Sequence, residues 1–276
     1  EMSANHQRRV SFENDLRQAL AQHQFELHYQ PQVSMSERRV IGVEALIRWR
    51  HPIHGLLNPG SFIPIAEESG LIVSMSDWAL REALQQWTVW RSAGLPAFRV
   101  SVNLSPQEFD HGDLVARVTA ALEESGAPPA ALELEITETM LMHDVDKVTA
   151  QVRELRSHGI RVAIDDFGTR YSSLNYLRRF SISTIKIDQS FIRDLDGDHG
   201  SLSIVRAILG IAHGFGLHVL AEGVENEDQV DALLGLGCAD MQGYLFARPM
   251  PGGEIGGFIA EVNDKLARVI APRPTH

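Results

Sequence analysis

The amino-acid sequence predicts an α/β domain folded as a (β/α)8 barrel of the TIM type, with one antiparallel strand near its N-terminus. Three observations predict this fold. Short apolar segments alternate with helix-like stretches over most of the chain, and three junctions repeat the order helix, glycine, apolar strand. The first two strands are separated by only about ten residues, which is too few for a helical crossover.

The predicted strands follow one another in chain order at residues 25–31, 40–49, 98–105, 131–138, 160–166, 183–189, 217–223 and 239–246. Between them, residues 76–94 and 111–126 have the apolar spacing of amphipathic helices. Gly159, Gly216 and Gly237 each separate a helix-like stretch from the strand that follows, at the place where a helix C-cap falls. The alternation therefore indicates helices on the outside of a mainly parallel barrel.

The ends of the chain differ in character from the barrel. Residues 10–24 predict a helix that leads into the first strand. We therefore divide the chain into an N-terminal helix or linker from an upstream domain (1–20), a barrel domain (21–264) and a C-terminal tail (265–276). The opening "EMSANHQRR" resembles an internal stretch of a longer protein, so we expect a parent protein with an upstream sensory or membrane domain.

Composition and charge exclude several function classes. The chain has 276 residues and a formal net charge of −11, which is unfavourable for wrapping a nucleic-acid polymer. Its single cysteine, Cys238, excludes an intramolecular disulfide framework and a thiolate metal cluster, and favours a reducing cytoplasm. No apolar run approaches the ~18 residues that a membrane span needs. We expect this domain in the cytoplasm, whereas its parent protein can be membrane-anchored.

Strand alternation separates side chains that face the barrel interior from those that face the helices. Most of the polar residues that it turns inward lie towards the C-terminal ends of their strands, where barrel enzymes keep their chemistry. Any one of these side chains could equally well fill the barrel interior, with its polar atoms hydrogen-bonded to neighbours or water. That explanation is much weaker for the whole set of converging polar residues. The inward set is Glu44, Ser101, Asn103, Glu133, Glu135, Ala163, Asp165, Lys186, Asp188, Glu222 and Gln242.

Two adjacent aspartates, Asp165 and Asp166, end an apolar strand and are followed by the turn "DFGT". Like charges at this spacing repel unless cations or donors compensate them. If Gly168 bends the chain, Asp165 can bridge two ions while Asp166 reaches the second. Two divalent ions roughly 3.5–4 Å apart are suited to in-line displacement at phosphorus. The all-oxygen ligands favour Mg²⁺, Mn²⁺ or Ca²⁺ over zinc.

The stretch "EALIRW" at residues 44–49 introduces a family resemblance. The chain resembles the EAL domain family, bacterial phosphodiesterases that hydrolyse cyclic di-GMP to linear 5′-pGpG by two-metal in-line attack of water. The resemblance covers roughly residues 20 to 260 and rests on a series of motifs in the family's order. They are "YQP", "EALIRW", "FIPIAEESG", "VNLS", "LELEITE", "DDFGT", "YSSL", "IKIDQSF", "AEGVE" and "QGYLFARP".

The resemblance implies a role for each matching residue. Glu44, Asn103, Glu135 and Asp165 would hold the first metal ion, and Asp165 and Asp166 would serve the second, with Glu222 also among the metal-binding residues. Lys186 and Glu222 would position or deprotonate the attacking water, with Gln242 supporting them. The implied ions are two Mg²⁺ or Mn²⁺, with Ca²⁺ inhibitory. The substrate-binding residues would be Gln30, Leu46, Arg48, Asp188 and Phe246; Glu138 would anchor the loop after Asp166, and Glu225 would support the site from behind.

Alternatives remain open at this stage. A catalytically silent cyclic di-GMP receptor is the main one, and a barrel lyase that acts on an enolisable acid is another. The family loop usually carries a second glycine, as in "DFGTGYSSL", where this chain has Arg170. We expect Arg170 to alter loop dynamics or the coupling between the subunits of a homodimer rather than the metal ligands. No "GGDEF" signature occurs, so the chain is not expected to synthesise the nucleotide.

Overall fold

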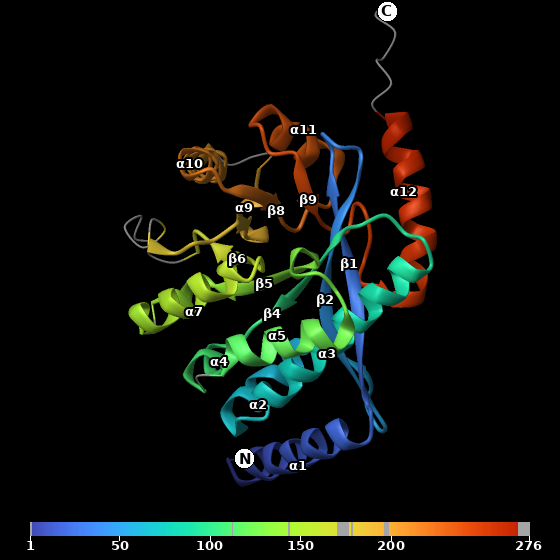
Figure 1. Cartoon of the computed structure of the whole chain (residues 1–276), viewed down its shortest axis with the longest axis vertical. Helices are drawn as coiled ribbons and strands as arrows, with labels where there is room; N and C mark the ends of the chain where they lie inside the picture. Colours follow the sequence, from blue (N-terminus) through green and yellow to red (C-terminus); the bar gives the residue numbers. More distant parts are fainter. Residues whose placement is uncertain are drawn as a thin grey trace, which may run out of the picture.

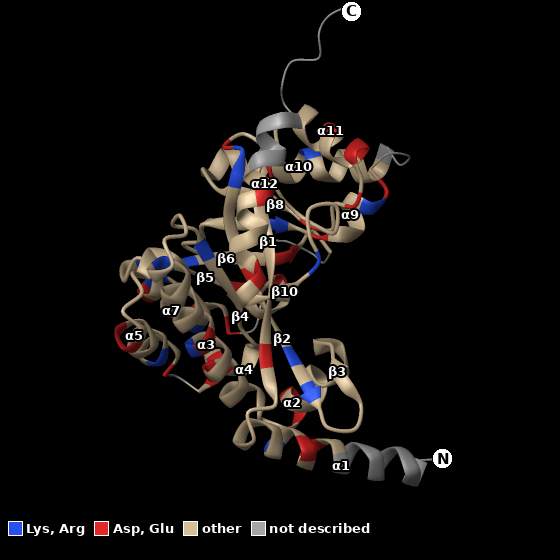
Figure 2. Ribbon diagram, turned by 90° about the vertical axis from the view of Figure 1, so that its right-hand side faces the viewer, with Lys and Arg blue, Asp and Glu red and all other residues tan. Residues whose placement is uncertain are grey.

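The computed structural model describes residues 2–111, 113–142, 144–169, 177, 179–195 and 199–269, with side-chain packing described from residue 12 to residue 263. Figure 1 shows strands at the centre of the molecule and helices around them. The N-terminal helix lies at one end and the end of the last helix at the other, an arrangement that Figure 2 shows from a second direction.

Eight of the ten strands found in the described residues close into a barrel, as predicted. Neighbouring barrel strands in the order β2, β4, β5, β6, β7, β8, β9 are parallel. Strand β1 lies between β9 and β2 and is antiparallel to both. The predicted antiparallel strand is therefore β1, which forms a hairpin with β2. The barrel strands are β1 (Phe25–Ser34), β2 (Arg39–His51), β4 (Arg99–Asn103), β5 (Leu132–Thr137), β6 (Arg161–Phe167), β7 (Thr184–Ile187), β8 (His218–Ala221) and β9 (Asp240–Gln242).

Two further strands extend the sheet beyond the barrel. The short strand β3 (Gly55–Leu57) pairs with the end of β2, and β10 (Met250–Pro251) pairs with β1. Both pairings are antiparallel and involve two or three residues on each strand. The β1–β2 hairpin is thus flanked by a short strand next to each of its two strands, and Figure 2 shows β3 close to α2.

The helices follow the strands in chain order and cover the outside of the barrel. None of those in the described part combines the length and apolarity needed to cross a bilayer. They are α1 (Met2–Ala21), α2 (Ile63–Ser69), α3 (Ile72–Ser92), α4 (Pro106–Asp110), α5 (Leu114–Ser125), α6 (Glu138–Leu141), α7 (Val145–Ser157), α9 (Gln189–Arg193), α10 (His199–Phe215), α11 (Glu227–Gly235) and α12 (Ile255–Val269), with 3₁₀ turns η1 (Pro59–Ser61), η2 (Pro129–Ala131) and η3 (Gly252–Glu254).

The predicted glycine caps are present. Gly159, Gly216 and Gly237 have φ values of 83°, 67° and 88°, in the left-handed region that a side chain would disfavour. Each ends a helix and turns the chain into β6, β8 or β9. The repeated glycine therefore marks the return from the outer helical layer to the barrel.

Strand alternation divides the barrel into two environments, as expected. On β5, Leu132, Leu134 and Ile136 are fully buried among the apolar side chains of the surrounding helices. The intervening Glu133 and Glu135 are also buried but face the barrel interior, where they meet polar partners. Burial of apolar surface, worth about 25 cal/mol per Å², thus supports the outer layer and leaves the interior free for polar chemistry.

A second apolar cluster joins the N-terminal helix to the barrel. Leu16 and Ala19 of α1 pack with Phe25, Trp49 and Phe62, which come from β1, β2 and the segment before α2. The predicted helix at residues 10–24 is longer than expected at its start and ends at Ala21. The α1 helix is therefore packed on the end of the β1–β2 hairpin.

Candidate active site

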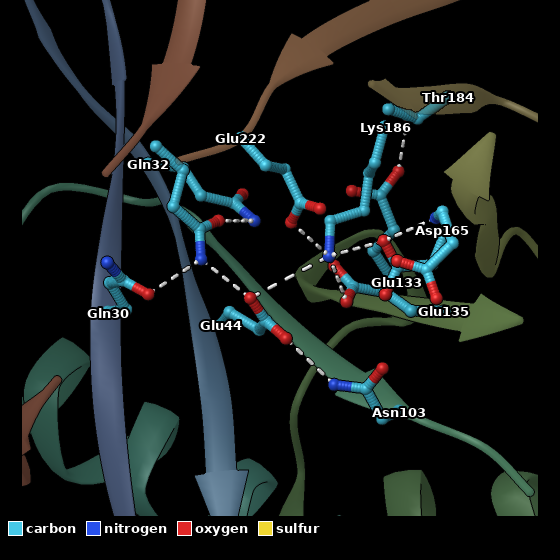
Figure 3. Close-up of polar contacts among 12 residues, drawn as sticks. Gln30, Gln32, Glu44, Asn103, Glu133, Glu135, Asp165, Thr184, Lys186 and Glu222 are labelled. Carbon is cyan, nitrogen blue, oxygen red and sulfur yellow. Dashed lines mark hydrogen bonds and ion pairs between the residues drawn. The ribbon is translucent and has the colours of Figure 1, made fainter. Parts of the chain in front are cut away.

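A lysine surrounded by four carboxylates lies inside the barrel (Figure 3). The Nζ atom of Lys186 on β7 is 2.6 Å from Glu135 Oε2, 2.8 Å from Glu222 Oε1, 3.3 Å from Asp165 Oδ1 and 3.7 Å from Glu44 Oε2. The carboxylates come from β5, β6, β2 and the residue after β8. The Lys186 side chain is only 1% exposed, so its ammonium group is paired by protein rather than by solvent.

The strand register explains why these side chains meet. In the parallel pairs, Glu44 on β2 lies opposite Ser101 on β4, and Asn103 on β4 lies opposite Glu135 on β5. Side chains at such positions point to the same face of the sheet. Because the barrel is closed, the polar residues at these positions converge on its interior.

Amide side chains fix the orientation of Glu44. Asn103 Nδ2 donates to Glu44 Oε1 at 2.8 Å, and Gln242 Nε2 donates to Glu44 Oε2 at 2.6 Å. Gln242 also donates to Gln30 Oε1 at 3.1 Å and accepts from Gln32 Nε2 at 3.1 Å. Both Glu44 oxygens are therefore occupied by donors whose own positions are fixed by neighbouring strands (Figure 3).

The electrostatics of the cluster are unbalanced. Burial raises the pKa values of Glu135 and Glu222 well above the usual range for glutamate. The positive charge of Lys186 lowers these pKa values, but only in part. Burial alone would lower the pKa of Lys186, but attraction to Asp165, Glu135, Glu222 and Glu44 outweighs it and holds that pKa well above its usual value. Four carboxylates facing one ammonium group leave an excess of negative charge that further cations would neutralise.

The paired aspartates form the rim of this cluster. The Asp166 backbone has φ = 54°, an uncommon conformation for a residue other than glycine, and its N–H donates to Asp165 Oδ1 at 2.9 Å. Burial, together with Asp165 and Asp188, raises the pKa of Asp166 to about 6. The expected bend uses Gly168, whose φ is 94°, but it begins two residues earlier at Asp166 itself.

The donor set fits divalent cations. Asp165, Asp166 and Glu222 each present a carboxylate oxygen, and these atoms all lie within 4.8 Å of one another. Glu135 Oε1 is buried and has no hydrogen-bond partner in the part of the chain that the structure describes. A buried carboxylate oxygen without a donor is costly unless a cation binds it. The available ligands are oxygen atoms, which suit Mg²⁺ or Mn²⁺.

Two cavities adjoin the cluster. A polar cavity of about 220 Å³ lies beside Glu44 and Asp166 and is also lined by Gln30, Glu222, Glu225, Gln242 and Tyr244. A more apolar cavity of about 250 Å³ lies between β2, α2, α3 and the end of β4 and is lined by residues such as Ile63, Met75 and Asn103. Leu46 lines both cavities, so the two spaces lie on either side of its side chain.

A model of the EAL domain family matches residues 13–249. The chain belongs to the EAL domain family. It is 44% identical over 259 residues to the bifunctional diguanylate cyclase/cyclic di-GMP phosphodiesterase MucR of Pseudomonas aeruginosa, covering 94% of this chain and 38% of that protein. It is 43% identical over 242 residues to the cyclic di-GMP phosphodiesterase NbdA of the same organism, covering 88% of this chain and 31% of that protein.

The structure of this EAL domain is also similar to solved structures. A cyclic di-GMP complex of the MucR phosphodiesterase aligns with a TM-score of 0.86 at 44% identity, covering 89% of this chain and 99% of that one. The EAL domain spans less than two-fifths of the length of MucR and NbdA, at 38% and 31% respectively.

Most of the predicted site residues of the EAL domain lie around the cluster and its cavities. Gln30, Leu46, Asp188 and Glu225 line the polar cavity. Glu138 accepts a hydrogen bond from the Gly168 N–H at 3.2 Å, and its role as an anchor of the loop stays a prediction. The predicted metal-binding and catalytic residues that converge are Glu44, Asn103, Glu135, Asp165, Asp166, Lys186, Glu222 and Gln242.

Two predicted substrate-binding residues lie outside the lining of both cavities in the described structure. Arg48 is buried and donates from Nη1 to the Ile47 carbonyl at 2.9 Å, and Phe246 packs against the main core. Their contacts with a ligand remain predictions. Arg170 lies outside the described residues.

Sequence reasoning missed Tyr244, which lines the polar cavity, and Gln32, which contacts Gln242. Tyr244 is half exposed, and the Arg248 guanidinium lies 4.3 Å from the centre of its ring. Tyr244 is two residues after Gln242, so alternation places both on one face and was the available signal. Gln32, which donates to Gln242, lies at the matching position two residues after Gln30.

Proposed function

We propose that this EAL domain is a metal-dependent phosphodiesterase that hydrolyses cyclic di-GMP to linear 5′-pGpG. The observation that supports it most strongly is the buried Lys186 with four carboxylates, two of which, Glu44 and Glu222, line the polar cavity. MucR and NbdA share over two-fifths of its residues at aligned positions; NbdA is named a cyclic di-GMP phosphodiesterase and MucR a bifunctional diguanylate cyclase/cyclic di-GMP phosphodiesterase. All members of the cluster that catalysis needs are present, which favours an enzyme over a silent receptor.

Two divalent ions, Mg²⁺ or Mn²⁺, would be held by the carboxylates and one amide oxygen. Glu44, Asn103, Glu135 and Asp165 would hold one ion, and Asp165, Asp166 and Glu222 the other. Such ions supply Lewis-acid activation of water and neutralise charge on the phosphate. The Asn103 amide would present its oxygen while its Nδ2 group donates to Glu44.

Lys186 and Glu222 would act together in removing a proton from the attacking water. Glu222 Oε1 accepts the proton, and the Lys186 ammonium, 2.8 Å away, keeps that carboxylate oriented towards the cavity. The water oxygen would attack phosphorus as the bond from phosphorus to the ribose 3′ oxygen breaks, and the 3′ oxygen would take up a proton from solvent, which leaves the linear dinucleotide with a free 3′ hydroxyl group. Gln242 holds Glu44 in place through its 2.6 Å hydrogen bond.

The two cavities would receive the nucleotide. The polar cavity beside Asp166, Asp188 and Gln30 suits a phosphodiester and ribose hydroxyl groups, whereas the more apolar one beyond Leu46 suits the flat face of a base. Arg48 and Phe246 would join the site through side-chain movement from their present contacts. A guanidinium fork is suited to bidentate phosphate contact.

Incubation with cyclic di-GMP and Mg²⁺ or Mn²⁺, followed by chromatography, tests this function. We expect 5′-pGpG to form, exhaustive chelation to stop the reaction, and Ca²⁺ to inhibit it because calcium prefers longer bonds and looser coordination. The Glu44→Ala variant is the matched negative control. Full activity after chelation would contradict the metal-dependent mechanism, and tight binding of cyclic di-GMP without turnover would establish the receptor instead.

A further inference from the structure

A buried glutamate outside the carboxylate cluster joins three elements next to the site. Glu108, on α4, is 2% exposed. Its Oε2 atom accepts from the Ser105 N–H at 2.8 Å, and its Oε1 atom lies 3.5 Å from Arg117 Nη2 on α5. The Ser76 hydroxyl of α3 is hydrogen-bonded to the same carboxylate. Glu108 thus ties the segment after β4 to α3 and α5.

The segment that Glu108 holds carries a predicted metal-binding residue. Asn103, two residues before Ser105, donates to Glu44 at 2.8 Å, and the Leu104 N–H between them donates to the Glu135 carbonyl at 2.9 Å. Leu104, Ser105 and Ser76 also line the apolar cavity. Any shift of the Ser105 backbone is therefore transmitted over two residues to Asn103 and to one wall of that cavity.

The charge of Glu108 is incompletely compensated. Its nearest cation, Arg117, is shared with Asp113 at 3.1 Å and Asp77 at 4.0 Å. Asp77 is itself bound to Arg81 at 3.0 Å. Burial raises the pKa of Glu108 to about 7, and the Ser105 N–H, Arg117 and Ser76 reduce the shift. The carboxyl group therefore changes charge near neutral pH.

We propose that Glu108 is a positioning residue that sets Asn103 and the wall of the apolar cavity through the Ser105 N–H, and that it does so more firmly in its ionised form. Hydrogen bonds to an ionised carboxylate are roughly twice as strong as those to a neutral acceptor. The ionised form therefore holds the Ser105 N–H and Arg117 more firmly. The turnover part of this inference rests on the proposed phosphodiesterase function.

The Glu108→Gln variant keeps the volume and an acceptor for the Ser105 N–H while removing the titration. At pH 6, kcat/KM is expected to match wild type within about twofold, and at pH 8 to be about fivefold lower than wild type. The ratio of the two proteins should change with a midpoint near pH 7. The matched control is Glu123→Gln on the exposed face of α5, whose profile should run parallel to wild type. A parallel profile for Glu108→Gln overturns the proposal.

A second measurement does not need turnover. The affinity for Mn²⁺, measured from the free-ion paramagnetic resonance signal, should show the same pH-dependent ratio between wild type and Glu108→Gln. The carboxylate cluster is common to both proteins, so its own titration cancels in the ratio. If neither protein hydrolyses cyclic di-GMP but this ratio changes, the proposed function fails and the positioning role stands. A ratio that is constant from pH 6 to pH 8 overturns the positioning role.

Thermal stability and a second variant distinguish a positioning effect from a folding defect. For a carboxyl whose folded pKa is raised from 4.5 to about 7, the stability advantage of the folded state is present below pH 4.5 and is lost as pH rises to about 7. The Tm of wild type relative to Glu108→Gln should therefore fall over this range.

Ser76→Ala removes only one hydrogen bond to the ionised form. The pH midpoint of its turnover should therefore move to a higher pH. An unchanged midpoint in Ser76→Ala contradicts the proposal.

Discussion

At the scale of single residues, the site is organised by the imbalance between Lys186 and its carboxylate neighbours. Interactions between charges inside a protein are several times stronger than in water. Lys186 relieves repulsion among Glu44, Glu135, Asp165 and Glu222, yet three of the four negative charges stay uncompensated if all are ionised. The metal-free protein therefore depends on this lysine and on carboxyl protonation, whereas in the proposed mechanism the metal-loaded protein uses it for catalysis.

Replacing Lys186 by Met separates these two roles. Removing one partner of a buried ion pair costs about 3–5 kcal/mol, so we expect the metal-free variant to unfold at a markedly lower urea concentration. Because the ammonium orients the group that accepts the proton, kcat should fall by about 10²-fold or more while the affinity for cyclic di-GMP changes little. Equal losses in kcat and affinity would instead make Lys186 a binding residue.

Single-residue placement was predictable where strand alternation applies. Alternation turned Glu44, Glu135 and Lys186 inward because each lies on a regular part of its strand, and it also held for Asp165, which keeps a regular pairing with Thr137 on β5. It could not predict the φ of 54° at Asp166, where the β6–β7 register shifts between Ile164 and Phe167 and local periodicity no longer applies. Nor could it identify Glu108, whose surroundings come from α3 and α5.

At the scale of elements, α1 and β2 form one packed unit. Trp49 Nε1 on β2 donates to Gln24 Oε1 at 3.0 Å, and the Phe12 ring of α1 lies 5.0 Å from the Trp49 ring, edge to face. Leu16 is completely buried in the same cluster. The strand that carries Glu44 and Leu46 is therefore fixed at its far end by the helix that precedes the barrel.

Leu16→Ala should measure how firmly α1 is docked. Truncation of a fully buried leucine leaves a cavity and costs about 2–5 kcal/mol. We expect the free energy of unfolding in urea to fall by an amount in this range in a single transition. Arg17→Ala, on the exposed face of the same helix, is the control and should cost less than about 1 kcal/mol. A Leu16→Ala protein as stable as the control would show that α1 is only a linker.

The long elements were predictable and the short ones were not. All eight barrel strands lie within the predicted segments or overlap them, because each has an apolar face and a flanking turn. Strands β3 and β10 consist of three and two residues and form only where the β1–β2 hairpin offers a free edge. The five-residue helix α4 depends on the capping box between Ser105 and Glu108, a local signal that strand and helix periodicity does not contain.

At the scale of the whole molecule, the net charge of −11 and the acidic barrel interior suit a small phosphate ligand that meets metal ions, not a nucleic-acid polymer. We propose that residues 21–264 act as the EAL barrel domain of a longer protein, preceded by a sensory or membrane domain that α1 connects, with residues 265–276 as a tail. The curated relatives MucR and NbdA are more than twice the length that this chain spans. A signal from upstream would reach β2 through the α1 cluster.

We further propose that the protein is a two-fold homodimer formed across α10. The base of the loop after Asp166 touches this helix, because a Cβ atom at Gly168 would lie 3.2 Å from Ile208 Cδ1. One turn before Ile208, Ile204 is 40% exposed, and Phe215 at the end of α10 is 43% exposed. An isologous contact over this surface would set both loops alike, and stable interfaces of this kind bury more than roughly 1,000 Å².

The Ile204→Glu variant tests this assembly together with its effect on the site. A charge placed in an apolar contact prevents association because it would be buried without a partner. Sedimentation should show a monomer at all concentrations and chromatography a reduced turnover, whereas wild-type turnover should fall on dilution as dimers dissociate. Val89→Glu adds the same charge at an exposed position on α3 and should change neither property.

Arg170→Gly, in the loop itself, should alter turnover more than Mn²⁺ affinity. A wild-type monomer with concentration-independent turnover would rule out the coupling between subunits. The position of the loop would then be determined by its contacts with Glu138 and α10 within one subunit.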